Sequence, residues 1–522
     1  MVQINHGRTL ASPHPLWHAR ETKDPRGLNG RELVMNARYV LCCAVLVVGR
    51  AVPVFGDGQP DPPVAGQAIV RLGTNGDIDA FIVQCEAAHA AMNLQMAVAD
   101  TIEGESTYLI EFDPSEADLT ELESYLNNYG SDQVTWGGFA YVAQAPEGGT
   151  GSIWFLGPDG PDFFGEQFAS GTLGLPAAHL SSTGQGTVVA VLDTGVDEFH
   201  PQLQGRVLAG GFNFVDNDGI TADAANGVDD DGDGVVDELV GHGTFVASLV
   251  TLAAPDALIL PIKVLNSDGV GSDWTVASGI QYAIDHGVDV INLSLSSTNP
   301  SDAIKEAIER AANLGIVTVS AAGNFGTDDR QYPAVESPVI GVAATDEQDV
   351  KASFSSYNED IAISAPGGNI YLPQGQPDPD YSIIGAMAGG DYVMWEGTSF
   401  ATALVSGGAA LVRAQHPEWP DADVPVDEIT DRIEQVLTST AVDIYSDELN
   451  PGFEDEELGE GRMNLAAALA PLGDLDYDGA VGILDYLLLL ADWGLTDDSP
   501  ADLDDNEVVG ITDLLILLEN WS

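Results

Sequence analysis

The middle of the chain alternates short apolar runs with longer segments of helical periodicity. Strands are predicted at 187–192, 257–265, 288–295, 316–322, 339–344 and 361–365. Helices are predicted at 242–253, 274–286, 302–314 and 399–414. The strand-like runs are mainly apolar and alternate with helices, so both faces of their sheet should be covered. The alternation therefore predicts an α/β fold with a doubly wound parallel sheet, whose functional groups gather at the carboxyl ends of the strands.

A smaller α+β unit is predicted before this region. Strand-like segments lie at 68–72, 106–112 and 134–144, and helical periodicity lies at 79–92 and 115–127. Stretches rich in Gly and Pro at 57–66 and 146–165 flank the unit and indicate linkers.

The end of the chain contains an internal repeat. Residues 474–493 (DLDYDGAVGILDYLLLLADW) and 502–521 (DLDDNEVVGITDLLILLENW) align without gaps, with eleven of twenty positions identical. Each copy begins with acidic residues and ends in a Leu-rich, helix-like run. The segment 472–522 is therefore predicted to be a duplicated unit that forms a small helical pair.

The N-terminal region has the pattern of an export signal. Residues 39–48 (YVLCCAVLVV) form a ten-residue apolar run preceded by Arg38, and Met35 is a suitable start. We therefore expect a signal peptide at 35–56, and residues 1–34 to come from a mis-set start codon or an extension. The alternative is a buried strand at 39–48. No apolar run reaches 18 residues, so no transmembrane segment is expected.

Composition narrows the function classes. The formal net charge is −65; residues 1–56 carry +4 and the remainder −69. A surface so acidic repels phosphate backbones, which argues against nucleic-acid binding and fits an exported protein or one that binds divalent cations. The three cysteines all lie at or before Cys85, so no disulfide can form in the rest of the chain. Metal ions are the remaining candidate for rigidifying an exported protein.

Three segments of the central region bring an acid, a base and a nucleophile to the ends of elements. Asp193 follows a buried strand, His242 opens a helix within GHGT, and Ser399 opens another within GTS. Taken singly, each has an ordinary structural explanation as a turn former, a tightly packed residue or a helix cap. Together, in an alternating α/β frame, they favour acyl transfer by an Asp-His-Ser triad.

These segments resemble those of the subtilases, the subtilisin-like serine proteases. The matching motifs are DTGVDEFHPQL (193–203), GHGTFVASLV (241–250), SAAGN (320–324) and GTSFATALVSG (397–407). They follow the subtilase order Asp, His, Asn, Ser. The resemblance covers roughly residues 166–470 and predicts a peptidase domain at 166–471. It departs from the family pattern at Ala403, where Pro is usual, which removes no catalytic group.

The resemblance assigns a role to each group. Ser399 attacks the peptide carbonyl, His242 takes and returns its proton, and Asp193 holds the imidazole tautomer. The carboxamide of Asn324 donates to the oxyanion, together with the helix N-terminus at Ser399.

Substrate is expected to bind as an extended strand between two protein segments, as in the resembling family. These segments are 267–272 (SDGVGS) and 292–297 (NLSLSS). The side chain of Ser296, where the family usually has Gly, is expected to crowd the pocket for the residue before the scissile bond. The implied substrate-binding residues are Gly269, Gly271, Ser294, Leu295, Ser296, Ala322 and Gly323.

Calcium is the expected cofactor, first at the loop 226–238 (NGVDDDGDGVVDE). Asp229, Asp231, Asp233 and Asp237 offer hard oxygen ligands around a permissive Gly. Val240 stands at position twelve and cannot ligate, so the loop is not an EF-hand. The alternative is a solvated acidic loop.

The repeat at 472–522 offers a second calcium expectation and resembles the dockerin modules of secreted bacterial enzymes. Glu507 replaces the turn Gly in the second loop, which should weaken that site. The alternative is a calcium-folded tail without a cohesin partner. The ligands expected at loop positions 1, 3, 5 and 12 are Asp474, Asp476, Asp478 and Asp485, then Asp502, Asp504, Asn506 and Asp513.

The sequence thus predicts a secreted or cell-surface, calcium-stabilised serine endopeptidase of protein or peptide substrates, made as a zymogen. Residues 57–165 would form a propeptide-like domain with its linkers, a temporary inhibitor or else a separate interaction domain. The tail would bind a cohesin-like or cell-surface partner. The competing class is a non-catalytic binding or scaffold protein that retains the fold, whose signature would be a lost triad or oxyanion residue. Cleavage specificity is not encoded in any recognisable motif.

Overall fold

The computed structural model describes residues 63–522 with short gaps. The gaps are 75, 91–93, 103, 116–118, 129–133, 148–152, 157–159, 370–376, 421–423, 447–448, 454–456, 496–498, 504–505 and 507. The expected signal peptide and the segment before it lie outside the described residues. Among the residues described, no helix combines the length and the apolar character that crossing a membrane requires.

A seven-stranded parallel sheet forms the centre of the molecule, in the order β13-β12-β11-β10-β6-β8-β7. Strands β10 and β11 are buried along their whole length and β6 at every residue but the first, as mostly apolar sequences favour. The strands are β6 (Val188–Asp193), β7 (Phe212–Asn213), β8 (Leu258–Lys263), β10 (Val290–Leu293), β11 (Val317–Ala321), β12 (Val339–Thr345) and β13 (Ile363–Pro366).

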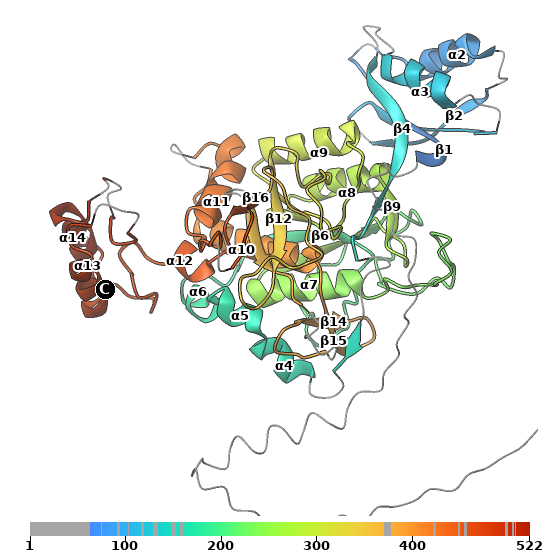
Figure 1. The fold of residues 1–522 in the computed structure, drawn as a ribbon. Helices are drawn as coiled ribbons and strands as arrows, with labels where there is room; N and C mark the ends of the chain where they lie inside the picture. Colours follow the sequence, from blue (N-terminus) through green and yellow to red (C-terminus); the bar gives the residue numbers. More distant parts are fainter. Residues whose placement is uncertain are drawn as a thin grey trace, which may run out of the picture. The chain divides into compact units, whose positions relative to one another are not determined.

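Two helix pairs cover the sheet, one on each face (Figure 1). On one face α7 (His242–Ala253) packs against α10 (Thr398–Gln415), which lies along β10 to β13. On the other face α8 (Asp273–Asp285) packs against α9 (Asp302–Asn313). Because α7 and α10 are adjacent, their N-termini bring His242 and Ser399 to the same side of the sheet.

A smaller sheet forms from the first part of the described chain. Four antiparallel strands stand in the order β2-β3-β1-β4, and β9 of the central region extends the sheet beside β4. The helices α2 and α3 pack with these strands around a separate core that includes Phe81 and Leu122. The elements are β1 (Pro63–Leu72), α2 (Ile78–Ala88), β2 (Met96–Ile102), β3 (Thr107–Phe112), α3 (Leu119–Asn128), β4 (Val134–Gln144) and β9 (Val270–Ser272).

The remaining elements of the central region surround the main core. A three-stranded sheet has the order β14-β15-β5. Its strands are β5 (Trp154–Phe155), β14 (Ile383–Met387) and β15 (Asp391–Trp395). The other elements are α4 (Gly160–Glu166), α5 (Phe168–Thr172), α6 (Leu175–Ser181), η3 (Val426–Glu428), α11 (Ile429–Thr438), β16 (Glu457–Glu460) and α12 (Leu465–Ala468).

The C-terminal repeat forms two helices, α13 (Ile483–Ala491) and α14 (Ile511–Glu519). They share a small apolar core whose buried members are Val481, Leu489, Ala501, Val509 and Leu517. Leu489 and Leu517 stand at equivalent positions of the two copies, so the repeat packs on itself.

The predicted fold class, a doubly wound parallel sheet, is confirmed. Some elements were not predicted, and two of the missed strands lack a strong pattern. The edge strand β2 buries only its first and last residues, so its sequence shows no alternation. The short strand β5 likewise falls within a stretch that the sequence indicates to be a linker.

Candidate active site

Asp193 and His242 form a buried pair at the carboxyl end of the central sheet. Asp193 is the last residue of β6, and His242 is the first residue of α7. His242 Nδ1 lies 2.7 Å from Asp193 Oδ1, and both side chains are inaccessible to solvent. A Cβ at position 243 would lie 2.1 Å from Gly195 O, so the Gly after His242 lets the helix approach the strand end closely.

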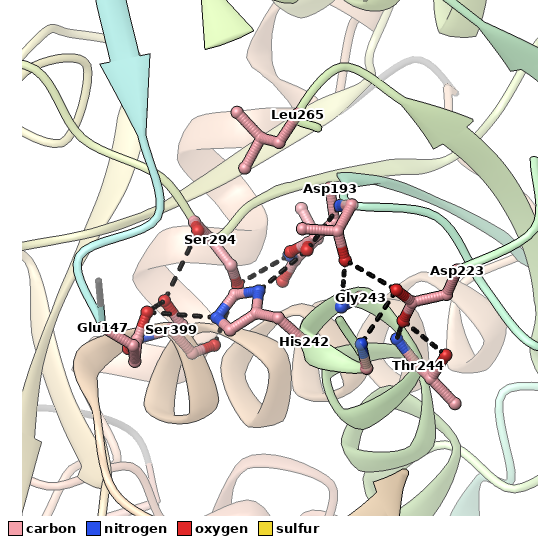
Figure 2. A network of polar contacts seen from close by, with 12 residues as sticks. Glu147, Asp193, Asp223, His242, Gly243, Thr244, Leu265, Ser294 and Ser399 are labelled. Atoms are coloured by element: carbon pink, nitrogen blue, oxygen red, sulfur yellow. Dashed lines mark hydrogen bonds and ion pairs between the residues drawn. The ribbon is translucent and has the colours of Figure 1, made fainter. Parts of the chain in front are cut away.

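Ser399 stands one residue into α10 and faces the same imidazole (Figure 2). Its Oγ donates a hydrogen bond of 2.7 Å to Glu147 Oε2. His242 Nε2 lies 3.0 Å from the same oxygen. The carboxylate of Glu147 thus stands between the hydroxyl and the imidazole that the sequence predicts to act on each other.

Asn324 lies beside Ser399 and is fixed by its neighbour. The backbone N–H and the hydroxyl of Thr398 both donate to Asn324 Oδ1, at 2.9 and 2.8 Å. This orientation aims Asn324 Nδ2 at Glu147 Oε1, 3.0 Å away, and Ser399 N donates to the same oxygen at 3.3 Å. The two groups expected to stabilise an oxyanion therefore converge on one negatively charged oxygen.

The charges around His242 favour its protonated form. Burial by itself lowers the pKa of the imidazole, but the carboxylates of Asp193 and Glu147 outweigh it and raise this pKa to about 10. With Glu147 in place, His242 is therefore an imidazolium near neutral pH and has no lone pair with which to accept a proton.

A second buried carboxylate, Asp223, joins the two elements that carry the acid and the base. Its Oδ1 accepts hydrogen bonds from Gly241 N at 2.8 Å and Thr194 Oγ1 at 3.2 Å. Its Oδ2 accepts from Thr244 N at 3.1 Å and from Thr244 Oγ1 at 2.7 Å. Burial raises the pKa of Asp223, and these donors oppose that rise. Asp223 thus caps α7 across the end of β6 (Figure 2).

The two segments expected to bind substrate hold a strand of the protein's own chain. Gln144 and Ser296 exchange backbone hydrogen bonds of 3.1 and 2.8 Å, and Ala145 N donates to Gly269 O at 2.9 Å. Gly271 pairs with Ala143 in the β4–β9 ladder. Segment 142–147 therefore enters the site between the two edges at which a substrate strand was expected.

The other residues expected to bind substrate lie close by and are buried. Ser294 Oγ donates to Ser399 O at 2.9 Å, and Leu295 is 1% exposed. Ala322 and Gly323 directly precede Asn324, and Gly323 has a φ of 94°, which only Gly adopts readily.

The acidic loop before His242 gathers three carboxylates. Oxygens of Asp229, Asp231 and Asp233 lie within 4.8 Å of one another. Asp237 is not in this group; its carboxylate accepts hydrogen bonds from the backbone of Asn226 and Gly227. Burial and neighbouring carboxylates raise the pKa of Asp231. A cation bound to this loop would offset the repulsion between these negative charges. The donor set of carboxylate oxygens fits calcium.

The first loop of the repeat gathers Asp474, Asp476 and Asp478 within the same distance. Asp485 is buried and accepts hydrogen bonds from the backbone N–H groups of Leu475 and Gly482. In the second loop Asp513 binds Leu503 N and Gly510 N in the equivalent way, and Asp502 accepts from Asn506 N. Asp504 lies outside the described residues.

Comparison with known proteins gives the same family as the motifs. The family model described as the subtilase family matches residues 184–464. Thermitase from Thermoactinomyces vulgaris is 36% identical over 276 residues, which cover 53% of this chain and 92% of thermitase. Subtilisin BL from Lederbergia lenta is 34% identical over 303 residues, which cover 56% of this chain and 94% of that protein.

A solved structure extends the likeness beyond the peptidase region. Fervidolysin from Fervidobacterium pennivorans, described as a keratinolytic enzyme related to subtilisin, matches with a TM-score of 0.58 over 80% of this chain and 63% of its own. Its sequence identity is 24%, so this likeness concerns the fold alone.

The chain belongs to the subtilase family. It is a serine endopeptidase of the subtilisin-like type, which confirms the predicted enzyme class. The sequence pointed to Asp193, His242, Ser399 and Asn324, and the structure brings all four together. Two further residues of the site had not been predicted. Glu147 lies in a Gly- and Pro-rich stretch that looks like a linker, and Asp223 is one of many acids in an acidic region.

Proposed function

We propose that Asp193, His242, Ser399 and Asn324 carry out peptide-bond hydrolysis in this chain. The observation that supports this most is the convergence of His242, Ser399 and Asn324 on a single carboxylate, with Asp193 behind the imidazole. One oxygen of this carboxylate is bound by the two groups expected to stabilise an oxyanion, and the other is bound by the serine and lies beside the histidine.

Each group then has one task in the reaction. Once the site is free, neutral His242 takes the proton from Ser399 Oγ as it attacks the carbonyl, and later gives it to the leaving amine. Asp193 binds Nδ1–H, so the lone pair of Nε2 faces the serine. Asn324 Nδ2 and Ser399 N bind the oxyanion. Loss of the equivalent amide in subtilisin itself costs about 10²–10³ in kcat, a magnitude carried over from that enzyme.

Substrate is proposed to bind as a strand between Gly269–Gly271 and Ser294–Ser296, with Ala322 and Gly323 beside the residue before the scissile bond. The support is that segment 142–147 uses the same edges. Residues 57–165 are then a propeptide-like region that inhibits the site before it is removed, which makes the full chain a zymogen. Export guided by residues 35–56 completes the proposal.

Replacing Ser399 tests the catalytic assignment. Ser399→Ala should abolish casein hydrolysis and leave the far-ultraviolet circular dichroism unchanged, since only one oxygen is removed. Full-length precursor should accumulate, because maturation in this family is self-cleavage. Casein hydrolysis at the wild-type rate by the purified Ala variant would show that another group is the nucleophile.

Calcium is proposed at two places, the loop with Asp229, Asp231 and Asp233 and the paired loops of the tail. In the tail the exposed apolar side chains of α13 and α14 also support a protein partner, cohesin-like or on a cell surface. Many large apolar side chains exposed on one small unit are typical of an interaction surface, and here they occupy equivalent positions of the two copies. The pairs are Ile483 and Ile511, Leu487 and Leu515, Leu490 and Leu518, and Trp493 and Trp521.

The partner proposal is tested by charge placed on this face. Leu487→Asp combined with Leu515→Asp should abolish calcium-dependent binding of the full chain to an immobilised cohesin module, while casein hydrolysis stays at the wild-type rate. Binding by neither the wild type nor the variant leaves only the calcium-folded tail.

A further inference from the structure

The side-chain carboxylate of Glu147 contacts all the groups that the proposed function assigns to the serine, the base and the oxyanion site. Its Oε1 accepts from Asn324 Nδ2 and Ser399 N, and its Oε2 accepts from Ser399 Oγ and lies 3.0 Å from His242 Nε2. The Glu147 and His242 side chains are both fully buried. Every donor of the proposed chemistry is thus bound to this one side chain.

The backbone delivers Glu147 in a fixed register. The backbone N–H and C=O of Gln144 both bond to Ser296, and Ala145 N donates to Gly269 O. Only Pro146 separates this ladder from Glu147, and Pro has no N–H to donate and a fixed φ. The side chain of Glu147 therefore reaches the oxyanion donors by a short and constrained connection.

The surroundings are shaped for a charged oxygen. A Cβ at Gly397 would lie 2.0 Å from Glu147 Oε1, so the Gly that precedes Thr398 leaves the space this oxygen occupies. Oε1 takes the position proposed for the oxyanion, and Oε2 binds the proton-bearing groups. Hydrogen bonds to an ionised acceptor are about twice as strong as neutral ones, so a carboxylate gains more here than an amide would.

We propose, building on the proposed function, that the reaction centre is a binding site for side-chain carboxylates and that Glu147 is its built-in ligand. An acidic peptide that reaches the site in this register inhibits the enzyme instead of being cleaved. The carbon of a carboxylate resists nucleophilic attack by the serine hydroxyl, because it already carries two electron-rich oxygens. A bound carboxylate also keeps His242 protonated, so the base is absent while the ligand stays. This assigns the inhibition to one side chain, in addition to the occupation of the cleft by the strand.

The test uses a fluorophosphonate probe that labels activated serines, and labelling is scored on the full-length precursor band alone, so that self-cleaved product does not contribute. Glu147→Gln keeps the volume and loses the charge, so labelling of Ser399 should become about tenfold faster than in the wild type. Glu147→Ala removes the ligand and should accelerate labelling about a hundredfold. Glu111→Gln, an exposed glutamate of β3, is the matched control and should label at the wild-type rate. Thermal melting of all variants checks that the fold is kept.

Acetate tests the ligand class directly in Glu147→Ala. Added acetate should slow labelling of this variant at least fivefold, and chloride at the same ionic strength should not. Equal effects of both salts would overturn the carboxylate site. The inhibitory role of Glu147 is overturned if Glu147→Ala labels no faster than the wild type. Failure of the proposed function looks different, because Ser399→Ala would then label as the wild type does.

Discussion

Asp223 ties the strand that ends in Asp193 to the helix that begins at His242. Its four hydrogen bonds reach Thr194 on one side and Gly241 and Thr244 on the other. It does not contact the position where a substrate would react, so we assign it a positioning role. Such a residue acts through the distance and orientation of the acid–base pair.

Asp223→Asn should therefore lower kcat about tenfold and leave KM nearly unchanged, because an amide cannot accept all four bonds. The lost negative charge should also lower the pKa of His242 in the mature enzyme and move the acid limb of the kcat/KM profile to lower pH. Asp349→Asn, which alters a carboxylate paired with Arg462 away from the site, is the control. A fall in thermal stability with an unchanged pH profile would reduce Asp223 to a purely structural residue.

At the residue scale, sequence motifs predict those groups whose neighbours are also constrained. His242 is followed by Gly243, and Ser399 follows Gly397 and Thr398, because each must approach a strand end or the oxyanion oxygen closely. Glu147 has no such local signature. Its position depends on a strand register formed with residues more than a hundred positions away, which no local pattern records.

At the scale of elements, the pairing of β4 with β9 holds residues 142–144 in a strand, so we expect maturation to cut the chain after this pairing. Residues 145–147 are buried, and the sequence that follows is rich in Gly and Pro. We expect maturation to cut between about Pro146 and Gln167, since connections of this composition are preferred sites of nicking. N-terminal sequencing of the mature protein checks this. A mature N-terminus before Ala68 would show that the smaller sheet stays attached and is not a propeptide.

Inhibition by Glu147 should weaken as pH rises. The pKa of His242 stands at about 10 with Glu147 bound, with burial lowering it and the two carboxylates raising it. When Glu147 leaves, one of the raising charges is lost, so the pKa falls. The side chain of Glu147 therefore binds more tightly when His242 is protonated. This extra affinity is lost as pH rises from the lower pKa of His242 in the free site toward its pKa of about 10 with Glu147 bound.

The measurement is the ratio of labelling rates of Glu147→Ala and the wild-type precursor between pH 7 and pH 10. Taking the ratio removes the ordinary rise in serine reactivity. The ratio should fall steadily with pH. A ratio that stays constant across this range would show that the charge on His242 contributes nothing to the inhibition.

The strands of the central sheet could be predicted because buried strands need mostly apolar residues, and such runs are visible in the sequence. Strands β6, β10 and β11 consist mostly of apolar residues, and α9, which connects β10 to β11, carries one apolar face. The strand β9 could not be predicted, because its three residues VGS have no strand pattern. It forms by pairing with β4, so its structure depends on a distant segment.

At the scale of the whole molecule, the large negative charge must be offset where carboxylates are gathered. Asp474, Asp476 and Asp478 lie together in the tail, and burial with neighbouring charges raises the pKa of Asp474. The small shared core of α13 and α14 contributes little stability without help. We therefore expect the proposed calcium binding to supply much of the folding free energy of this unit.

An isolated 472–522 peptide should therefore gain helix on addition of calcium and lose it with a chelator. Asp485→Ala should weaken the response more than Asp476→Ala, because the buried Asp485 also holds Leu475 and Gly482 together. Circular dichroism measures both effects. Equal helicity with calcium and with chelator would show that the loops are ordinary turns.

The most direct test of the whole account is to find the residue that a fluorophosphonate modifies. Mature enzyme, together with variant precursors cut by immobilised wild-type enzyme that is then removed, is labelled, digested and mapped by mass spectrometry. The account predicts one labelled residue, Ser399, with labelling lost in His242→Ala and reduced by several orders of magnitude in Asp193→Asn, as in other Asp-His-Ser triads. Labelling of another serine, or labelling of Ser399 that persists without His242, would contradict it.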